Sequence, residues 1–499
     1  MTYGLIIYPV KYTKLKYTDG SNFEGNTALL TDFYEITMAA GYYFSQYHKD
    51  WETKGIFELF VRRLPKNRSY LVTAGLQQSV EYILNFKFNK HEIDYLRSLD
   101  AFRGIKQDFY DYLLKMRFTG DLWAVPEGTV LFPTEPILRI EAPIIEAQLL
   151  ETYLLSTINF QTLIATKASR ICNIANNKPI IEFGSRRAHG PEAALLAARA
   201  SYVGGCAGTS NTLAGMRFGI PVYGTMAHSF IMSFESEIIA FKEFQKLFPD
   251  GYLLVDTYDT LNAIKMIIQE GILPKGVRLD SGDLLYLSKK IREMFDEAGD
   301  RDRDYYSTKI MVSGDLDENI IKELLKNKAP IDSFAVGTEL STSRDDPVLN
   351  GVYKMVATIV QRQDKLNQSN KETKLSNDSE KTVGKASTQK SIIYKVKTSP
   401  GKHTYPGPKQ IHRILDDKRI LIQDIISLAD ELIEGSLPLL EKIIENGSIV
   451  KSLPSLDATQ LYHIQQVQMI PFLTNLDQVQ SFPVSYSKKL LKLTDELGV

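Results

Sequence analysis

One repeated pattern constrains the fold of this chain more than any other feature. Between about residue 178 and residue 350, short β-branched, apolar runs alternate with stretches whose apolar residues recur at helical spacing. A tip of Gly, Ser, Thr, Asp, Arg or His follows each run. Alternating strands and helices imply parallel strand pairing with right-handed crossovers. The runs are KPIIEFGSRR, IPVYGTMAHS, YLLVDTYD, KGVRLDSGD, KIMVSGD and DSFAVGTEL.

This succession of units, without the polar turn pairs of hairpins, favours an α/β barrel with parallel strands. In such a barrel the functional groups gather at the carboxyl ends of the strands. An open doubly wound sheet is the alternative, and it also binds ligands at the carboxyl ends of its strands. Both architectures therefore predict that the polar tips converge on one site.

The segments on either side of the repeat predict a second, mixed α+β domain built from the N- and C-terminal parts. Proline-rich, β-like stretches such as AVPEGTVLFPTEPILRIEAP lie there. A polar segment after the last unit is nearly devoid of large apolar side chains and cannot offset the entropy of ordering. We therefore expect an N-terminal extension (1–22), the first part of the second domain (23–150), the barrel (151–360), a flexible polar insert (361–392) and the completing part of the second domain (393–499).

The composition narrows the classes of function. The chain has 59 Lys and Arg against 60 Asp and Glu, so it has no basic surface suited to nucleic acid. The only two cysteines, Cys172 and Cys206, lack metal-ligand spacing, which suits a reducing compartment. No apolar run reaches the roughly 18 residues of a membrane span, and the start MTYGLIIYPVKY lacks the marks of a signal peptide. We expect a cytoplasmic protein without nucleic-acid or membrane partners.

The strand tips are rich in anion donors and in carboxylates that can bind hydroxyl groups. Any one Ser-Gly or Gly-Asp pair is ordinary turn chemistry. Together, the amides of glycine-rich tips and the neighbouring carboxylates suggest a phosphorylated sugar as ligand. His228 could be a metal ligand, a general base, a nucleophile or a core residue, but no second His or Cys stands at zinc-binding spacing. We therefore expect no metal site made of protein ligands alone.

Six motifs in this order resemble nicotinate phosphoribosyltransferase, a type II phosphoribosyltransferase family. They are LLTDFYEITMAAGYY, EFGSRRAHGPEAAL, GTSNTLAG, YGTMAHSF, VRLDSGDL and FAVGTEL. The resemblance implies an irregular α/β barrel plus a second domain, usually in a homodimer whose active sites are shared between subunits. It implies synthesis of nicotinate mononucleotide from nicotinate and phosphoribosyl diphosphate in NAD salvage, with ATP hydrolysis coupled to the transfer and Mg²⁺ neutralising the diphosphate.

The same resemblance implies roles for residues at the tips. His228 would be the nucleophile that ATP phosphorylates, Asp256 would orient its ring, and Asp280 would support the reacting ribose. Arg186 and the amides of Gly337 and Thr338 would take phosphate. Phe183 would stack on the pyridine, with Tyr34 of the partner subunit on its other face. The remaining substrate-binding candidates are Asn211, Thr225, Arg278, Ser281, Asp283, Ser313, Gly314 and Asp315.

Asn211 separates two competing activities. The enzyme that uses nicotinamide has an aspartate at this place, which would repel the carboxylate of nicotinate. Asn211 can instead donate to that carboxylate, and Arg278 can form a charge-assisted pair with it. Nicotinamide phosphoribosyltransferase and a non-catalytic nucleotide-binding homologue remain as alternatives. A sugar-phosphate lyase or isomerase is disfavoured, because no lysine stands at a predicted strand tip.

Overall fold

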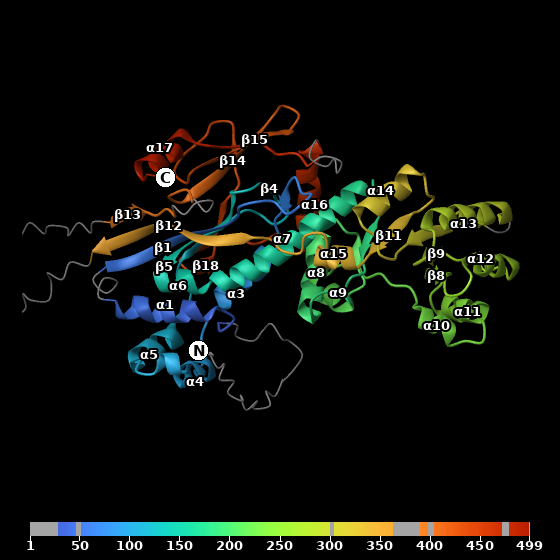
Figure 1. Ribbon diagram of the computed structural model, residues 1–499, viewed down its shortest axis with the longest axis horizontal. Coiled ribbons are helices and arrows are strands. Elements are labelled where there is room, and N and C mark those ends of the chain that lie inside the picture. Colours follow the sequence, from blue (N-terminus) through green and yellow to red (C-terminus); the bar gives the residue numbers. More distant parts are fainter. Residues whose placement is uncertain are drawn as a thin grey trace, which may run out of the picture.

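A computed structural model describes residues 28–45, 51–299, 304–362, 390–397, 404–471 and 479–498. The predicted extension (1–22) and most of the predicted insert (363–389) lie outside these residues. The described chain forms two parts along the long axis of the molecule, one around a parallel sheet and one around mixed sheets (Figure 1).

The repeat folds into a parallel sheet of six strands, five of which match the predicted runs. Their order is β7 (Gly208–Thr209), β6 (Ile180–Glu182), β11 (Ser333–Val336), β10 (Lys309–Val312), β9 (Gly276–Leu279) and β8 (Leu253–Leu254), with every pair parallel. Strand β7 is a further strand, and the run IPVYGTMAHS forms no strand of its own. β6, the first strand of this parallel sheet along the chain, pairs with β11, the last, which is how a barrel closes. A single bridge adds Val222 beside Thr209. Among the described residues no pairing joins Val222 to β8, so the barrel is irregular and open at this seam.

Helices follow the strands, and aspartates set where several of them begin. Asp259, Asp283 and Asp317 each accept a hydrogen bond from the backbone three residues on. A carboxylate at this position satisfies a free N–H and complements the helix dipole. The helices are α8 (Pro191–Val203), α9 (Thr212–Phe218), α10 (His228–Met232), α11 (Glu237–Leu247), α12 (Thr260–Gln269), α13 (Leu284–Ala298), α14 (Glu318–Lys326) and α15 (Thr338–Thr342).

Both ends of the chain build the second part, as the sequence predicts. Its main sheet has the order β13 (Lys390–Tyr394), β12 (Gly351–Arg362), β1 (Trp51–Val61), β5 (Pro136–Pro143), β3 (Asp121–Ala124), β17 (Glu441–Glu445) and β18 (Ser448–Ile449). A second sheet has the order β16 (Leu437–Pro438), β14 (Lys409–Leu415), β15 (Leu421–Leu428) and β19 (Val484–Tyr486), and β2 (Leu71–Val72) pairs with β4 (Val130–Leu131). The predicted barrel segment ended at residue 360, yet β12 pairs with β1 along its whole length and so belongs to this mixed sheet.

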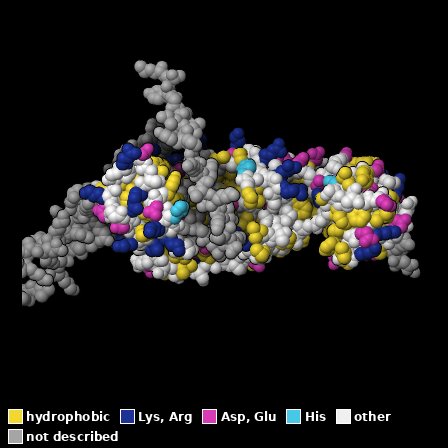
Figure 2. Space-filling model, turned by 90° about the horizontal axis from the view of Figure 1, so that it is seen from below, with side chains coloured by type: hydrophobic (Ala, Val, Ile, Leu, Met, Phe, Trp, Pro, Cys, Tyr) yellow, Lys and Arg dark blue, Asp and Glu magenta, His cyan; other side chains and the backbone are white. Residues whose placement is uncertain are grey.

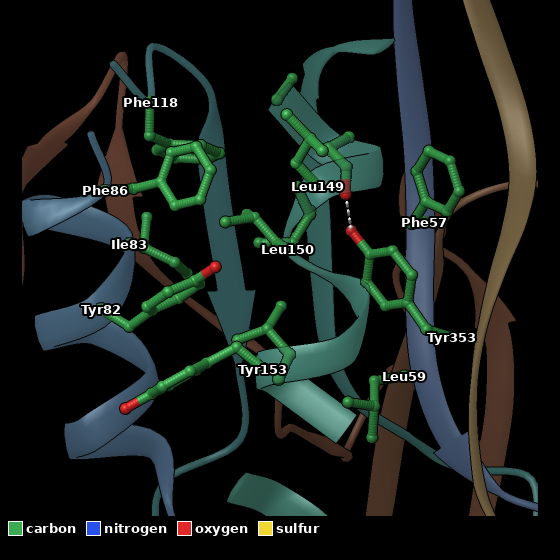
Figure 3. Packing of buried hydrophobic residues seen from close by; sticks show 14 of the residues in the cluster. Phe57, Leu59, Tyr82, Ile83, Phe86, Phe118, Leu149, Leu150, Tyr153 and Tyr353 are labelled. Carbon is green, nitrogen blue, oxygen red and sulfur yellow. Dashed lines mark hydrogen bonds between the residues drawn. The ribbon is translucent and has the colours of Figure 1, made fainter. Parts of the chain in front are cut away.

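The remaining helices cover the mixed sheets. They are α1 (Phe33–Phe44), α3 (Leu76–Asn85), α4 (Lys90–Ser98), α5 (Gln107–Lys115), α6 (Ile144–Leu149), α7 (Glu151–Ile174), α16 (Leu456–Gln468) and α17 (Lys488–Glu496), with a short 3-10 helix η1 (Asp100–Phe102). Aromatic side chains fill the core between them (Figure 3). Tyr82 stacks on Tyr153 with 3.7 Å between ring centroids, and the hydroxyl of Tyr353 donates to the carbonyl of Ala147 at 2.8 Å. The ring of Tyr82 is thus held by stacking, and the hydroxyl of Tyr353 is held by a hydrogen bond.

Helix α7 connects the two parts. It has 24 residues, and its side chains enter the cores on both sides. Near its middle, the buried ammonium of Lys167 lies 2.6 Å from Glu318 of α14 and 3.0 Å from Asp345 after α15. These carboxylates keep the buried cation paired, and they fasten α7 to the helices that surround the parallel sheet.

No helix within the described ranges is long and apolar enough to span a membrane.

Candidate active site

Arg278 on β9 is the centre of a polar cluster at the carboxyl edge of the parallel sheet. Its Nε donates to Ser313 Oγ at 2.9 Å, and its Nη1 donates to Thr225 Oγ1 at 2.8 Å. Its Nη2 donates to Asp280 Oδ1 at 2.7 Å. Ser313 follows β10 and Thr225 follows the bridge at Val222, so one guanidinium joins the tips of separate strands. We call Arg278, Thr225, Asp280 and Ser313 the Arg278 cluster.

Asp280 is held as an anion in this cluster. Burial alone would raise the pKa of its carboxyl, but the hydrogen bonds from Arg278 and Ser313 more than offset burial, and the pKa lies below its ordinary value. Its second oxygen, Oδ2, lies 3.8 Å from Nε2 of His228. The carboxylate therefore stands between the guanidinium and the imidazole.

His228 is the first residue of α10, and its ring remains partly open to solvent, with 41% of the side chain exposed. Its Nδ1 lies 3.1 Å from Thr257 Oγ1. Because the Thr257 hydroxyl holds Nδ1, the other ring nitrogen, Nε2, faces Asp280. The tips after β8 and β9 thus fix the orientation of the ring.

The sequence predicted that Asp256 orients the ring of His228. In the described structure no hydrogen bond joins these two side chains. Asp256 Oδ2 instead accepts from the backbone N–H of Asp280 at 2.9 Å and from Ser281 Oγ at 2.6 Å. Its other oxygen, Oδ1, is buried and has no hydrogen-bond partner among the described residues. The turn of the DSGD tip brings its own donors to this carboxylate, and Thr257, the next residue in the chain, takes the place beside the imidazole.

Gly314 permits the Arg278 cluster to form. Its φ of +91° is costly for other residues, and a Cβ there would lie 2.0 Å from the carbonyl oxygen of Asp280. Asp315, next in the chain, also has a positive φ of 44° and is exposed. The Ser-Gly-Asp tip therefore brings the backbone against the Asp-Ser-Gly-Asp tip.

Phe183 and Asn211 extend the site along the sheet edge. The guanidinium carbon of Arg278 lies 5.8 Å from the centroid of the Phe183 ring. Asn211 precedes α9, and its Oδ1 accepts from the backbone N–H of Ala214 at 3.0 Å. That bond uses the acceptor end of the amide, so its two Nδ2 hydrogens stay available to a ligand.

Comparison with known proteins gives the family. A model of the nicotinate phosphoribosyltransferase N-terminal domain matches residues 29–159, and the model of the nicotinate phosphoribosyltransferase family matches residues 179–400. Nicotinate phosphoribosyltransferase pncB2 of Mycobacterium tuberculosis is 40% identical over 473 residues, which cover 93% of this chain and 92% of that protein. The chain belongs to the nicotinate phosphoribosyltransferase family.

Further members of the family agree over most of their length. Nicotinate phosphoribosyltransferase of Bacillus subtilis is 42% identical over 416 residues, covering 82% of this chain and 77% of that protein. The crystal structure of human nicotinic acid phosphoribosyltransferase matches with a TM-score of 0.75 at 26% identity, over 94% of this chain and 100% of that one. The family resemblance that the motifs predict is confirmed, and so is the irregular barrel with a second mixed domain.

Several residues predicted to bind substrate make no direct hydrogen bond or ion pair with the Arg278 cluster within the described part of the chain. Asp283 caps α13 by accepting from Tyr286 N at 2.9 Å. Gly337 lies beside Phe183, because a Cβ there would be 3.4 Å from the Phe183 carbonyl oxygen. Thr338 begins α15, and the exposed Arg186 follows β6. These residues border the same edge of the sheet without touching the cluster.

Tyr34 lies far from the Arg278 cluster in this chain. It is on α1, at the opposite end of the molecule from α10 (Figure 1), and it is 48% exposed. Partial burial, and then the charges of Glu151, Glu35 and Asp32, raise the pKa of Tyr34 to about 12, so the phenol stays protonated at neutral pH. A role for Tyr34 at the cluster therefore requires a second copy of the chain.

Exposed apolar side chains gather near the barrel end of the molecule. Met232, Leu247 and Tyr258, from α10 through the tip after β8, are 63%, 76% and 66% exposed. Figure 2 shows yellow patches over this end when the molecule is viewed from below. Apolar patches of this kind are typical of surfaces that contact another protein.

Proposed function

We propose that this protein synthesises nicotinate mononucleotide from nicotinate and 5-phosphoribosyl 1-diphosphate, in NAD biosynthesis by salvage, with ATP hydrolysis coupled through a phosphohistidine. The observation that carries the proposal is the Arg278 cluster, which gathers a cation, a carboxylate and two hydroxyls beside Phe183 at one edge of the barrel. The names of the relatives point to the same reaction.

The acid substrate fits the charges at this edge. Arg278 can donate to the carboxylate of nicotinate through the Nη2 hydrogen that Asp280 does not use, and the free amide hydrogens of Asn211 can donate to it as well. Phe183 offers an aromatic face on which the pyridine ring can stack. An amide substrate would instead need an acceptor in place of the Asn211 donors.

Transfer of the phosphoribosyl group depends mainly on positioning. The bond from C1 of the ribose to diphosphate breaks, and the pyridine nitrogen forms the new bond to C1 while positive charge develops on the ribose. Asp280, held as an anion, stabilises that charge. The phosphate end of the substrate then extends toward Gly337 and Thr338, with Arg186 as a further cation.

His228 is the proposed phosphate acceptor. With Nδ1 held by Thr257, the lone pair of Nε2 attacks the γ-phosphorus of ATP, an N–P bond forms, and the bond to the ADP oxygen breaks. Water later cleaves the phosphohistidine. The added negative charge would stand beside Asp280, so it changes how tightly the site holds its anionic substrates and products.

Mg²⁺ fits as a partner of the substrate phosphates. No group of three or more His, Cys, Asp and Glu side chains that could hold a metal occurs in the residues that the structure describes. Magnesium commonly uses one or two protein carboxylates together with phosphate oxygens and water. The unpartnered Oδ1 of Asp256 and the carboxylate of Asp280 are the oxygens that would hold it, and it would neutralise the leaving diphosphate.

A homodimer with shared sites is part of the proposal. The exposed ring of Tyr34 and the distance of α1 from the Arg278 cluster support a Tyr34 that acts in the site of the partner subunit. The exposed apolar side chains near the barrel end support a protein contact there. The substrates are small metabolites, and the proposed location is the cytoplasm.

The test is a direct assay with the purified chain, phosphoribosyl diphosphate, Mg²⁺ and ATP, supplied with either nicotinate or nicotinamide. Mononucleotide should form from nicotinate and depend on ATP. Product from the amide alone would assign nicotinamide phosphoribosyltransferase activity. Product from neither, with nucleotide still bound, would mark a non-catalytic homologue.

A further inference from the structure

Glu182, a residue without a role in the proposed chemistry, stands beneath the site. It ends β6, directly before Phe183, and none of its surface is exposed. Its Oε1 accepts from the backbone N–H of Gly184, and its Oε2 accepts from Thr209 Oγ1 at 2.6 Å. No cation pairs with it in the described chain, so these donors are what keep the buried acid satisfied.

The side chain of Glu182 joins two loops that run to the site. Gly184 belongs to the loop that carries Phe183, and Thr209 ends β7, directly before the loop that carries Asn211. The backbone adds a third bond, since Ser210 N donates to the Glu182 carbonyl at 2.9 Å. The buried side chain of Glu182 therefore adds to the backbone pairing of β6 with β7 in fixing the spacing between the aromatic face and the amide.

The Thr209 hydroxyl links Glu182 to Asn211. Its hydroxyl hydrogen is given to Glu182, so its oxygen is free to accept, and Asn211 N donates to it at 2.9 Å. Thr209 is fully buried, so water does not compete for the hydroxyl. With its backbone N–H held by Thr209 and its Oδ1 held by Ala214, Asn211 has only its Nδ2 hydrogens left to give.

The direction of this chain of hydrogen bonds depends on the acid. A carboxylate can only accept, which obliges the Thr209 hydroxyl to donate toward Glu182 and to accept from Asn211. A neutral side chain that can donate at residue 182 would let the Thr209 hydroxyl accept from residue 182 instead. The hydroxyl hydrogen could then point toward the Asn211 N–H, where two hydrogens would face each other. The charge and position of Glu182 thus help to fix, through Thr209, the backbone position of the residue that distinguishes acid from amide.

We propose that Glu182, acting through Thr209, is a positioning residue that holds Asn211 in register with Phe183 and so sets the preference for a pyridine carboxylate over a pyridine carboxamide. This inference rests on the proposed function and deepens it. Neither Glu182 nor Thr209 needs to touch the substrate, because each acts by fixing a group that does.

The test compares Thr209→Val with Thr209→Ser. Valine keeps the shape of the side chain and removes the hydroxyl, while serine keeps the hydroxyl. We expect Thr209→Val to raise the KM for nicotinate about tenfold, the effect of one lost hydrogen bond. The KM for phosphoribosyl diphosphate should stay within about twofold, and the ratio of kcat/KM for nicotinate to that for nicotinamide should fall about tenfold. Thr209→Ser should restore both the KM and the ratio to within about twofold of the parent values.

Two results with Thr209→Val would overturn the inference. One is a Thr209→Val enzyme whose KM for nicotinate stays within about twofold of the parent value, and the other is a variant in which both KM values rise equally, as general loosening would cause. Glu182→Gln gives a second measurement and should lower the same acid-to-amide ratio while its circular dichroism matches the parent. An unchanged ratio in Glu182→Gln counts against the inference. A parent protein inactive on nicotinate would instead overturn the proposed function itself, so the two failures are distinguished by the parent rate.

Discussion

Arg278 Nη2 donates to Asp280 Oδ1 at 2.7 Å, although both side chains come from the same strand end. Asp280 directly follows β9 and lies two residues after Arg278, so the end of this strand places the cation and the anion together at the sheet edge. The remaining donors of Arg278 reach Ser313 and Thr225. A change in one of these side chains therefore disturbs the others.

Arg278→Lys should separate charge from geometry. Lysine keeps the positive charge but cannot reproduce the planar fork that serves Ser313, Thr225 and Asp280 at once. We expect kcat/KM for nicotinate to fall at least about a hundredfold, consistent with the loss of two or three charge-assisted bonds. Steady-state kinetics measure this, and a variant within about threefold of the parent would refute the central role of the guanidinium.

Gly314→Ala should damage both stability and activity, and Gly104→Ala provides a matched control. Both glycines have a φ of +91°, but a Cβ at Gly104 meets nothing within 4 Å, whereas one at Gly314 would lie 2.0 Å from the Asp280 carbonyl oxygen. Gly104→Ala should cost about 1 kcal/mol for the backbone alone. Gly314→Ala should cost at least about 2 kcal/mol more, because the backbone must move.

Denaturant unfolding measures the two stability losses, and the assay with nicotinate measures activity. Only Gly314→Ala should lose activity. Equal losses of stability in the two variants would show that the backbone at Asp280 moves away from the new Cβ at little cost in free energy.

His228→Ala should abolish acid-labile phosphate incorporation from labelled ATP and leave slow, ATP-independent transfer. Undiminished labelling would mean that another group carries the phosphate. Thr257→Val is a milder variant for comparison with His228→Ala, because it removes the hydroxyl beside Nδ1 of His228 and keeps the imidazole. Losing that one hydrogen bond should slow labelling about fivefold.

Glu35→Gln should change how stability depends on pH. Burial raises the pKa of the Glu35 carboxyl to about 7, despite hydrogen bonds from Thr31 and Thr152 that oppose the shift. An unfolded glutamate ionises near pH 4.3. Between about pH 4.3 and pH 7 the folded state therefore binds more protons than the unfolded state, and stability falls as pH rises, by up to about 3 kcal/mol.

The amide in Glu35→Gln does not titrate, so this fall should disappear from the variant. Urea unfolding at pH 5, 6 and 7 checks the prediction. A parent protein whose free energy of unfolding stays level across these values would contradict it.

The sequence predicted those parts of the fold that depend on local patterns. Apolar runs followed by polar tips identified five of the six strands of the parallel sheet, but they missed β7, and the run IPVYGTMAHS forms only the bridge at Val222. Parallel pairing then required Arg278, Asp280 and Ser313 to meet at one edge. The assignment of β12 to the barrel was wrong, because its pattern marks a strand without specifying a partner. Its partner, β1, comes from the other end of the chain.

The hydrogen bonds within the site were less predictable. The carboxylate of Asp256 turns to Ser281 and the Asp280 backbone, and Thr257 takes the imidazole, because the closely packed turns decide which donor each oxygen reaches. Spacing along the chain cannot distinguish two adjacent polar residues at one tip. The hydrogen bond from Thr209 to Glu182 could not be predicted for a similar reason. A glutamate inside an apolar run does not indicate which residue of another strand its carboxylate will reach.

The seam between Val222 and β8 leaves the segment that carries His228 paired with a strand on one side only. Within the described chain, no ladder bonds bind this stretch to a neighbouring strand on that side. If His228 accepts phosphate as proposed, α10 could shift without breaking the pairing of β6, β11, β10 and β9. In the proposed reaction, the bond between Thr225 and Arg278 would then be a direct link through which a change at His228 reaches β9.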